Sequence, residues 1–445
     1  MKKVITYGSF DLFHEGHYKL LERAKALGDY LIVGVTTEHY DESRGKMNVI
    51  NSLMERIENV KSTGFADEII IEDHVGQKLE DIIKYNIDIF TVGSDWEGVF
   101  DYLKDYCEVV YLERTKGISS TMLRAKNFDI IKLGVIGSGR IANRFIPEAK
   151  YVSGINIECV YNPNEESAKN FAKNHQLNKY FSDLNAFFND VNAVYIASPH
   201  ETHYEYIKKA LEHKKHVLCE KPMVLRGDEA RGLFKLAKEN NCVLMEAIKT
   251  AYCPGFNQMI STIKSGAIGE IKDVEATFTK LEKPNTRELT DTKYGGSFTE
   301  LASYTLLPII KIFGTDYKDL RFETIKNPNG VDIYTKAYFN YGNAVATSKN
   351  GLGVKSEGQL IISGTKGYCI VEAPWWKTKS FELRFEDSDL NDKSFFKFLG
   401  DGLRYELSDF VALVNGNGGK AYRLTREESI ALADIMERFL NERNR

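Results

Sequence analysis

Two short apolar runs in this sequence each end in a glycine-rich turn, and these turns constrain the fold more than any other feature. The first run is Val4 to Tyr7, followed by Gly8-Ser9-Phe10-Asp11, and the second is Ile130 to Ile136, followed by Gly137-Ser138-Gly139-Arg140. A strand that leads into such a turn and then a helix is typical of nucleotide-binding βα units. The chain therefore starts an α/β nucleotide fold twice, and we place the boundary near residue 128.

The periodicity of the remaining chain predicts three domains within 445 residues. Apolar runs alternate with helical spacing up to about residue 250, which predicts parallel sheets. Beyond Pro254 the runs are longer and alternate in polarity, which favours an antiparallel sheet. We expect an α/β chain with a Rossmann-like nucleotide domain at 1–128, a Rossmann dinucleotide domain at 129–250 and an α+β domain with a mainly antiparallel sheet at 251–445.

The overall composition excludes several classes of protein. A net charge of -4 provides no basic surface for nonspecific nucleic-acid binding, and no apolar stretch reaches the roughly 20 residues that a membrane span needs. The six cysteines form no CxxC pair, which favours reduced thiols over disulfides or a structural zinc site. We expect a cytoplasmic enzyme that binds small molecules, with neither a nucleic-acid partner nor a membrane partner and with no resident metal.

Two histidines follow the first glycine turn. His14 and His17 precede or open a predicted helix over Tyr18 to Leu27, whose N-terminus offers free backbone N–H groups to an anion. Transfer of a nucleotidyl group places charge on phosphate oxygens, which fixed donors and cations stabilise. Either histidine alone could be a surface residue, but the pair behind a strand favours a phosphate site.

Three motifs in this region resemble the cytidylyltransferase family, in its glycerol-3-phosphate cytidylyltransferase branch. They are GSFDLFHEGH at 8–17, VGSDWEGVFDYL at 92–103 and ERTKGISST at 113–121, and the resemblance covers about residues 1–128. It implies that His14 and His17 stabilise the transition state at the α-phosphate of CTP, with Mg²⁺ accompanying the triphosphate.

The same resemblance implies further contacts. Arg114, Ser119 and Thr121 would bind the triphosphate, and Lys46 would contact phosphates. Arg56 is either a phosphate ligand or a solvated charge on a helix, Asp11 a magnesium ligand or a cap, and Trp96 a pocket wall or a packing residue. The other residues assigned to the CTP site are Gly8, Phe10, Gly93 and Asp95.

The second glycine turn has the context of a dinucleotide fingerprint, with Ala142 in the third small position. The usual acidic residue at the end of the next strand is absent, since Cys159-Val160-Tyr161-Asn162 stands there, and no arginine replaces it. The choice between NAD and NADP therefore stays open.

Further motifs are similar to the glucose-fructose oxidoreductase and inositol dehydrogenase family, in its dihydrodiol dehydrogenase-like branch. They are ASPHETH at 197–203, EKP at 220–222, MEA at 245–247 and GTKGYCIVEAPWW at 364–376, and the similarity spans residues 130–445. It implies that Lys221 lies beside the nicotinamide and that Tyr304, after the pair Gly295-Gly296, is the proton donor.

In that scheme Lys221 lowers the pKa of Tyr304. The alternative for Tyr304 is a half-buried core aromatic. Two positions depart from the family pattern, Glu300 in place of aspartate and Ala302 in place of glycine. The cofactor would contact Gly137, Gly139, Arg140, Ile141, Asn162, Ser198, His200, His203 and Glu220.

The union of both sites in one chain suggests consecutive reactions: a carbonyl compound, such as a sugar phosphate, is reduced to a polyol phosphate, which then receives CMP from CTP. Two alternatives stay open. The C-terminal part could be an NAD(P)-sensing regulatory module, or the reductase could act after the transferase on the nucleotide-linked product. Both families commonly form homo-oligomers, so we expect one here.

Overall fold

The computed structural model describes residues 1–11, 13–37, 40, 53–74, 76–113, 130–415 and 423–443. The chain divides into two compact units, the first built mainly from Met1–Ile130 and the second from Ile131–Ala149 and Asn156–Arg445. Within the described ranges, no helix has both the length and the apolar character that a bilayer crossing requires.

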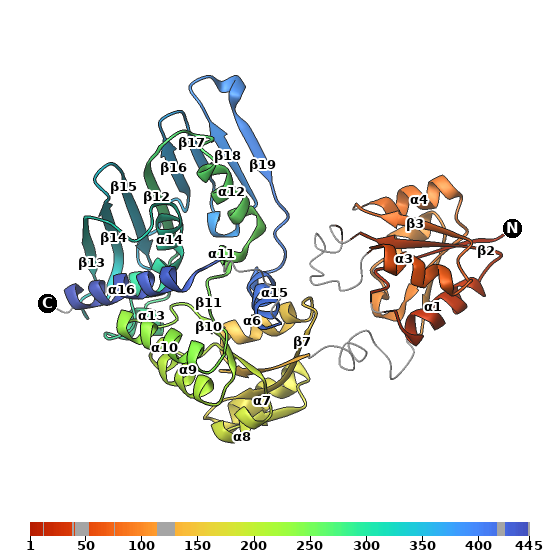
Figure 1. Cartoon of the computed structure of the whole chain (residues 1–445), viewed down its shortest axis with the longest axis horizontal. Helices are drawn as coiled ribbons and strands as arrows, with labels where there is room; N and C mark the ends of the chain where they lie inside the picture. The colour runs from red at the N-terminus through yellow and green to blue at the C-terminus, as the bar shows by residue number, and fades with distance from the viewer. Residues whose placement is uncertain are drawn as a thin grey trace. The chain divides into compact units, whose positions relative to one another are not determined.

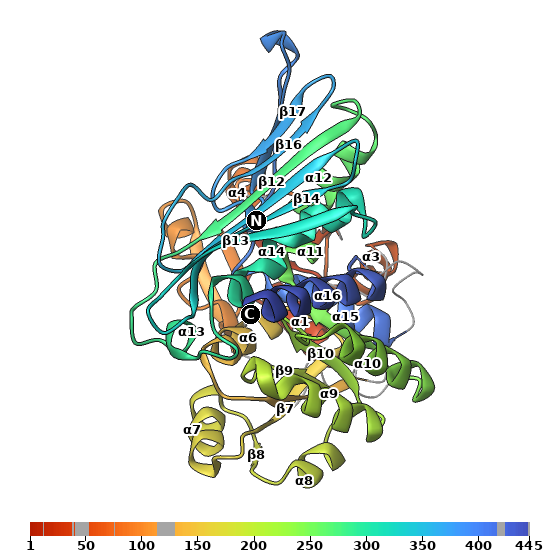
Figure 2. The same ribbon diagram turned by 90° about the vertical axis from the view of Figure 1, so that its left-hand side faces the viewer.

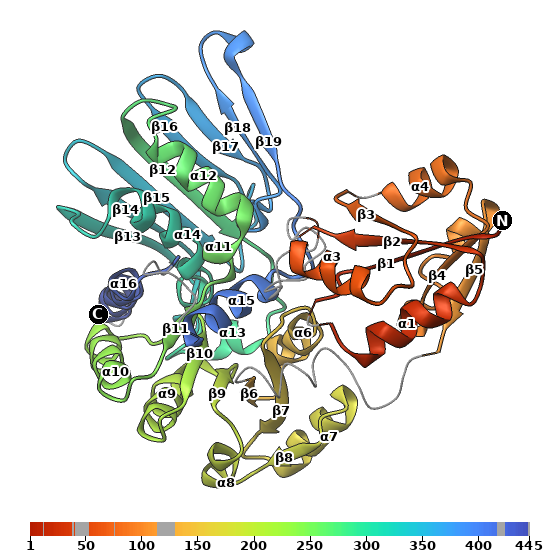
Figure 3. The same cartoon turned by 45° about the vertical axis from the view of Figure 1, so that its right-hand side comes forward.

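The first unit is a parallel five-stranded sheet in the order β3-β2-β1-β4-β5. Leu21 of α1 and Val60 of α3 pack in the core on one face, whereas Ile82 of α4 packs on the other (Figure 3). The strand β5 was not predicted, although its sequence EVVYL is β-branched and aromatic. The elements are β1 (Lys3–Gly8), α1 (Glu15–Lys25), β2 (Tyr30–Thr36), α3 (Leu53–Ser62), β3 (Glu68–Glu72), α4 (Gln77–Tyr85), β4 (Ile89–Gly93), η1 (Ser94–Trp96), η2 (Asp101–Asp105) and β5 (Glu108–Leu112).

The second unit begins with a six-stranded sheet in the order β11-β10-β9-β6-β7-β8. The strands pair in parallel in β11–β10, β10–β9, β9–β6 and β7–β8. The chain adds β7 and β8 on one side of β6 and then returns to add β9, β10 and β11 on the other, so the fold is doubly wound as predicted. The elements are β6 (Ile131–Ile136), α6 (Arg140–Ala149), β7 (Ile155–Tyr161), α7 (Glu165–His175), β8 (Lys179–Phe181), α8 (Leu184–Asn189), β9 (Ala193–Ile196), η3 (His200–Thr202), α9 (His203–Glu212), β10 (His216–Glu220), α10 (Gly227–Glu239) and β11 (Leu244–Ala247).

The second part of this unit is an eight-stranded sheet in the order β13-β14-β15-β12-β16-β17-β18-β19. Its pairings are antiparallel except that of β12 with β15, so the predicted sheet type is confirmed with one parallel pair. Helix α14 packs on β12, β14 and β15 (Figure 1). The elements are α11 (Lys249–Tyr252), α12 (Pro254–Lys264), β12 (Ile271–Thr279), α13 (Arg287–Thr290), α14 (Ser297–Phe313), β13 (Asp319–Lys326), β14 (Asp332–Asn340), β15 (Val345–Gly351), β16 (Leu360–Gly364), β17 (Tyr368–Val371), η4 (Trp375–Lys377), β18 (Ser380–Arg384), η5 (Ser388–Leu390), β19 (Asp392–Phe395), α15 (Leu403–Val414) and α16 (Arg426–Arg443).

Two helical contacts join the two sheets of the second unit. The last helix, α16, packs against both α10 and α14, so it lies between the two parts (Figure 2). Helix α15 packs against α6, where Arg404 meets Glu148 in a buried ion pair with Nε–Oε2 at 3.0 Å and Nη2–Oε1 at 3.1 Å. Because both side chains are removed from water, loss of one partner would leave an uncompensated charge in the core.

We predict that Glu148→Gln lowers the free energy of unfolding of the second unit by about 3 kcal/mol, the cost of leaving the Arg404 guanidinium buried without a counter-charge. Urea unfolding in a Trp96→Phe background would measure it, because the remaining tryptophans, Trp375 and Trp376, both belong to the second unit. The matched control is Arg226→Gln, which breaks an exposed pair with Asp228 and should cost less than about 1 kcal/mol. Equal losses in the two variants would contradict the prediction.

Candidate functional site

The site in the first unit lies at the carboxyl ends of β1 and β4. Strand order reverses between these two neighbours, because β2 and β3 extend the sheet on one side and β4 and β5 on the other. Crevices at such a point are the usual ligand sites of open α/β sheets. The topology therefore brings the turn from Gly8 to His17 and the residues after Gly93 to one edge, as the motifs predicted.

His14 is the N-cap of α1, and its contacts define its tautomer. Its backbone is extended, and its Nδ1 accepts hydrogen bonds from the backbone N–H groups of Gly16, at 2.9 Å, and His17, at 3.4 Å. With Nδ1 acting as an acceptor, the hydrogen of the neutral ring sits on Nε2. The Nε2–H group is thus the one that His14 can offer to an anion.

His17 lies directly against His14. The two rings stack with centroids 3.9 Å apart and an angle of 18° between their planes, and Phe10 and Phe13 each contact His17 with centroids 5.5 Å apart. Phe10 is buried and has a left-handed backbone, with φ at 49°, which is uncommon for a residue with a side chain and is concentrated at functional turns. The predicted histidine pair is therefore a preformed unit at the start of a helix.

Arg56 corrects one of the sequence alternatives. It is not a solvated helix charge, because it is fully buried and donates hydrogen bonds to the carbonyl oxygens of Ser9, at 2.9 Å, and Thr36, at 2.7 Å. These carbonyls belong to the turn after β1 and to the end of β2, so Arg56 braces the strand ends that carry the site. A buried arginine of this kind carries no signal in a single sequence, because its helix reads as amphipathic.

The remaining predicted residues of this site divide into two groups. Asp11 is buried in the turn, and Trp96 is half exposed with its ring 5.9 Å from that of Phe100. Lys46, Arg114, Ser119 and Thr121 lie outside the described residues, as does the side chain of Asp95. Across the described ranges, no cluster of three or more histidine, cysteine or acidic side chains could hold a metal ion.

The second unit contains a cavity of about 740 Å³ at the point where the order of its six-stranded sheet reverses, between β6 and β9. The cavity walls come from both parts of the unit, including Phe278 of β12 and Trp376 of η4. All eleven residues assigned to this site from the sequence line it: Gly137, Gly139, Arg140, Ile141, Asn162, Ser198, His200, His203, Glu220, Lys221 and Tyr304.

The glycine turn fits a dinucleotide. Gly137 has φ at 105°, and a Cβ there would lie 2.6 Å from the carbonyl oxygen of Ala197, so no larger residue fits. A Cβ on Gly139 would meet nothing within 4 Å, which leaves open space above the start of α6. The N-terminus of that helix and Arg140 can then receive the pyrophosphate of the cofactor.

Lys221 links the two parts of the second unit at the cavity. It follows β10, and its Nζ donates a hydrogen bond of 2.9 Å to the carbonyl oxygen of Glu300 in α14. The same Nζ lies 5.5 Å from the centroid of the Tyr304 ring. The lysine and the tyrosine predicted to act together are therefore neighbours.

The expectation that Lys221 lowers the pKa of Tyr304 is wrong. Burial raises the pKa of Tyr304 well above its usual value, and the nearby carboxyl groups of Glu220 and Glu406 act in the same direction. Lys221 Nζ lies over the ring, and the charge that acts against the rise of this pKa is that of Arg144. Tyr304 is consequently a neutral phenol, which suits a proton donor.

Several contacts fix the loop that carries Lys221. The ring nitrogens of His203 lie 2.9 Å from the carbonyl oxygens of Pro222 and Ser198, and Glu246 accepts a hydrogen bond of 3.0 Å from the N–H of Met223. Burial lowers the pKa of His203 and raises that of Glu246 to about 7. His203 thus braces the loop as well as lining the cavity.

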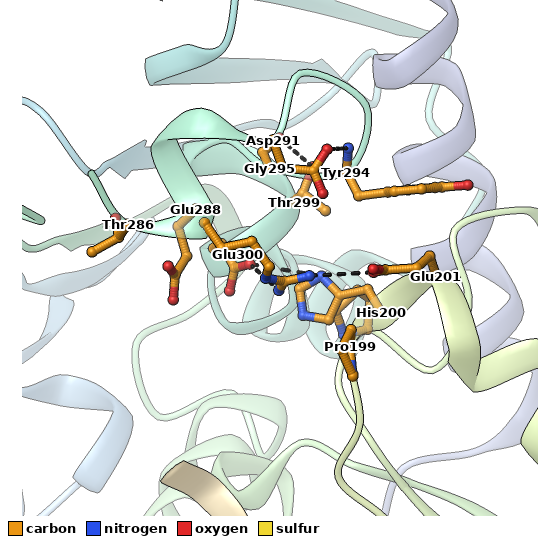
Figure 4. A network of polar contacts seen from close by, with 12 residues as sticks. Pro199, His200, Glu201, Thr286, Glu288, Asp291, Tyr294, Gly295, Thr299 and Glu300 are labelled. Atoms are coloured by element: carbon orange, nitrogen blue, oxygen red, sulfur yellow. Dashed lines mark hydrogen bonds and ion pairs between the residues drawn. The ribbon is translucent and has the colours of Figure 1, made fainter. Parts of the chain in front are cut away.

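Arg287, which the sequence analysis did not identify, also lines the cavity. The guanidinium of Arg287 contacts Glu201 of η3 at 3.2 Å and Glu300 of α14 at 3.3 Å, and Figure 4 shows these acids and His200 gathered there. Burial lowers the pKa of His200 well below its usual value, with the charge of Lys221 adding to this, so the ring is neutral. Arg287 was missed because its segment, after β12, matches no motif.

Comparison with known proteins agrees with this division of the chain. A cytidylyltransferase-like model matches residues 5–126. The NAD-binding Rossmann fold of the GFO/IDH/MocA oxidoreductase family matches 131–248, and the C-terminal domain of that family matches 256–370.

Individual relatives match each half separately. Glycerol-3-phosphate cytidylyltransferase of Bacillus subtilis is 53% identical over 124 residues, which are 28% of this chain and 95% of the relative. The NADP(+)-dependent scyllo-inositol 2-dehydrogenase of Bacillus subtilis is 28% identical over 318 residues, 69% of this chain and 95% of the relative. A 3-ketoreductase from Actinomadura kijaniata, solved with NADP and TDP-benzene, has the same fold with a TM-score of 0.60 at 23% identity, over 69% of this chain and 96% of that one.

Both resemblances drawn from the sequence motifs are thus confirmed. The chain belongs to the cytidylyltransferase-like family through its first domain and to the GFO/IDH/MocA family through the rest, as a cytidylyltransferase fused to an NAD(P)-dependent oxidoreductase.

Proposed function

We propose that this enzyme makes a CDP-activated polyol in two consecutive reactions. The oxidoreductase reduces a carbonyl compound, of the sugar phosphate class, to a polyol phosphate with NAD(P)H, and the transferase moves CMP from CTP onto that phosphate with release of pyrophosphate. The observation that carries the proposal is the position of Lys221 beside Tyr304 in the cavity. A module that only senses a cofactor would need neither side chain there.

In the transferase, we assign His14 and His17 to stabilising charge at the α-phosphate. The Nε2–H of His14 and the N-terminus of α1 provide donors where negative charge grows on the nonbridging oxygens. The phosphate oxygen of the acceptor forms the new P–O bond, and the bond to pyrophosphate breaks. Mg²⁺ bound to CTP would neutralise charge on the departing pyrophosphate.

In the oxidoreductase, the nicotinamide supplies hydride to the carbonyl carbon. Tyr304 donates the proton that the resulting oxyanion needs, since its raised pKa keeps the hydroxyl protonated. Lys221, held by the carbonyl oxygen of Glu300, places a positive charge near that developing negative oxygen. The reaction thus oxidises the cofactor, reduces the carbonyl to an alcohol and consumes one proton.

The product would be CDP-glycerol or a related CDP-polyol that supplies a surface polymer such as teichoic acid or capsule. The identity of 53% to a glycerol-3-phosphate cytidylyltransferase supports a small polyol phosphate as acceptor. A shared chain raises the local concentration of the intermediate, but direct transfer between sites does not follow from linkage alone.

A substrate panel tests the overall proposal. Purified protein is supplied with CTP, Mg²⁺ and polyol phosphates while pyrophosphate release is followed, and NADPH or NADH oxidation is measured with the matching carbonyl compounds. A matched pair, in which the product of the reductase is the best acceptor of the transferase, is the expected result. Pyrophosphate release with glycerol 3-phosphate and no reduction of any carbonyl compound would instead favour the regulatory module.

We expect Lys221→Gln and Tyr304→Phe each to lower kcat/KM for carbonyl reduction by about 10²- to 10⁴-fold, because each removes a group that acts on the developing oxyanion. Cytidylyl transfer should stay within twofold of the unmodified protein. Lys235→Gln and Tyr368→Phe, at exposed positions away from the cavity, are the matched controls. Unchanged NADPH oxidation in both cavity variants would disprove the assignment.

We expect His17→Gln and His14→Asn to lower the rate of pyrophosphate release by about 10²- to 10³-fold, the usual loss when one donor to a developing charge is removed. Asparagine at position 14 keeps an N-cap acceptor for α1, so the helix start is preserved. His74→Ala, at an exposed histidine of the same unit, is the control and should change the rate less than twofold. NADPH oxidation should be normal in all three variants.

A further inference from the structure

A corner of the oxidoreductase cavity carries positive charge that the proposed reaction does not use. Among the described residues, seven cationic side chains line this cavity, and four of them are paired with acids. Those with an acidic partner are Arg140 with Glu288, Arg144 with Asp401, Lys280 with Glu282, and Arg287 with Glu201 and Glu300. This leaves Lys221, whose role is already assigned, together with Lys249 and Lys377.

Lys249 is the more unusual of these two lysines. It is the first residue of α11, directly after β11, and its side chain lines the cavity although only 8% of the residue is exposed. None of the residues that the structure describes offers its ammonium group a hydrogen bond or an ion pair. Burial lowers the pKa of Lys249, while the acid Glu406 behind it acts in the opposite direction. A nearly buried ammonium without a partner is costly unless an anion joins it.

Three cations converge on this corner from separate elements. Arg144 of α6 holds the carboxylate of Asp401 with Nε–Oδ2 at 2.7 Å and Nη2–Oδ1 at 2.5 Å. The segments that carry the two lysines meet at the cavity, because the hydroxyl of Thr250, directly after Lys249, donates a hydrogen bond of 2.8 Å to the carbonyl oxygen of Trp376, directly before Lys377. The hydrogen bond from Arg144 lowers the pKa of Asp401, and the charges of Lys249 and Lys377 act in the same direction. Asp401 can neutralise only one of the three cations. Glu406 and Glu220 also act on Lys249, but burial raises the pKa of both acids and so favours their neutral forms, which leaves the corner with surplus positive charge.

The corner lies at the reacting end of the cavity. Trp376, directly before Lys377, stacks on Phe278 with ring centroids 3.6 Å apart, and the Phe278 ring lies 5.3 Å from that of Tyr304. The glycine turn and the start of α6, which suit the pyrophosphate of the cofactor, already have their own donors. An anion bound by Lys249 is therefore part of the carbonyl substrate rather than of the cofactor.

We propose that Lys249, together with Lys377 and the Arg144–Asp401 pair, forms the subsite for a phosphate group of the substrate that Tyr304 protonates. This inference rests on the proposed reductase function and specifies its substrate as a phosphorylated carbonyl compound. The alcohol product then keeps its phosphate, which is the acceptor group that cytidylyl transfer requires. The subsite thus places reduction before transfer.

The test compares Lys249→Gln with the unmodified full-length protein on ketose phosphates and on the corresponding free ketoses. We expect the unmodified protein to prefer the phosphorylated member of a pair in kcat/KM. Lys249→Gln should reduce that preference by about 10- to 100-fold, mainly through KM, because a hydrogen bond to a charged group is lost. Turnover of the free ketose and the KM for NADPH should stay within twofold.

Further variants separate a charge effect from a packing effect. Lys249→Arg keeps the charge and should retain most of the preference, and Lys377→Gln should weaken it less, because that lysine is less buried. Lys272→Gln is the matched control, since Lys272 lies on β12 away from the cavity in an ion pair with Glu270. An equal preference in Lys249→Gln and the unmodified protein would overturn the subsite, as would a rise in KM confined to NADPH.

A binding measurement distinguishes failure of the subsite from failure of the reductase proposal. Calorimetric titration of NADPH-loaded protein with inorganic phosphate should show a binding event that Lys249→Gln lacks, whatever anions the first unit also binds. If no carbonyl compound is reduced but this difference is seen, the reductase proposal fails and the anion site stands. If reduction occurs and phosphate binds equally to both proteins, the subsite is wrong and the reductase proposal stands.

Discussion

The buried ion pair between Glu148 and Arg404 underlies the architecture of the oxidoreductase. It joins α6, the helix that starts at the dinucleotide turn, to α15 in the other part of the unit. Glu148 also accepts a hydrogen bond of 3.0 Å from the backbone N–H of Asp401, and the carboxylate of Asp401 in turn holds Arg144 at the cavity. A single buried carboxylate thus positions both the segment before α15 and the charged corner that it supports.

The two catalytic sites arise from the same physical arrangement. In each unit the chain builds a parallel sheet outward in both directions from its first strand, and the ligand site forms where the order reverses. A helix is the next element after the first strand in both cases, α1 from Glu15 and α6 from Arg140, and each helix start has free N–H groups that suit phosphates. In the proposed reactions one helix start receives a nucleoside triphosphate and the other a dinucleotide, and different side chains follow the two turns.

The ionisable groups of the oxidoreductase cavity fall into two sets, acidic groups that burial keeps protonated and cationic side chains. Burial raises the pKa values of Tyr304, Glu220 and Glu406, which favours their neutral forms. Among the described residues, Lys249 and Lys377 line the same cavity without an ion pair to an acid, so an anion bound there would be their partner. Such a low-dielectric site can deliver a proton to an oxyanion and bind a phosphate at the same time, because charges act more strongly there than in water.

The sequence by itself determined the parts of this protein whose signals are local. Glycine turns after strands, the histidine pair and the EKP segment each encode their geometry within about ten residues, so the fold class and the eleven cavity residues could be predicted. Only the tertiary structure decided the burial of Arg56, the direction of the Tyr304 pKa and the gathering of Arg144, Lys249 and Lys377. These depend on packing between segments that are not adjacent in the sequence and on the sum of charges that meet there, and neither leaves a pattern along the chain.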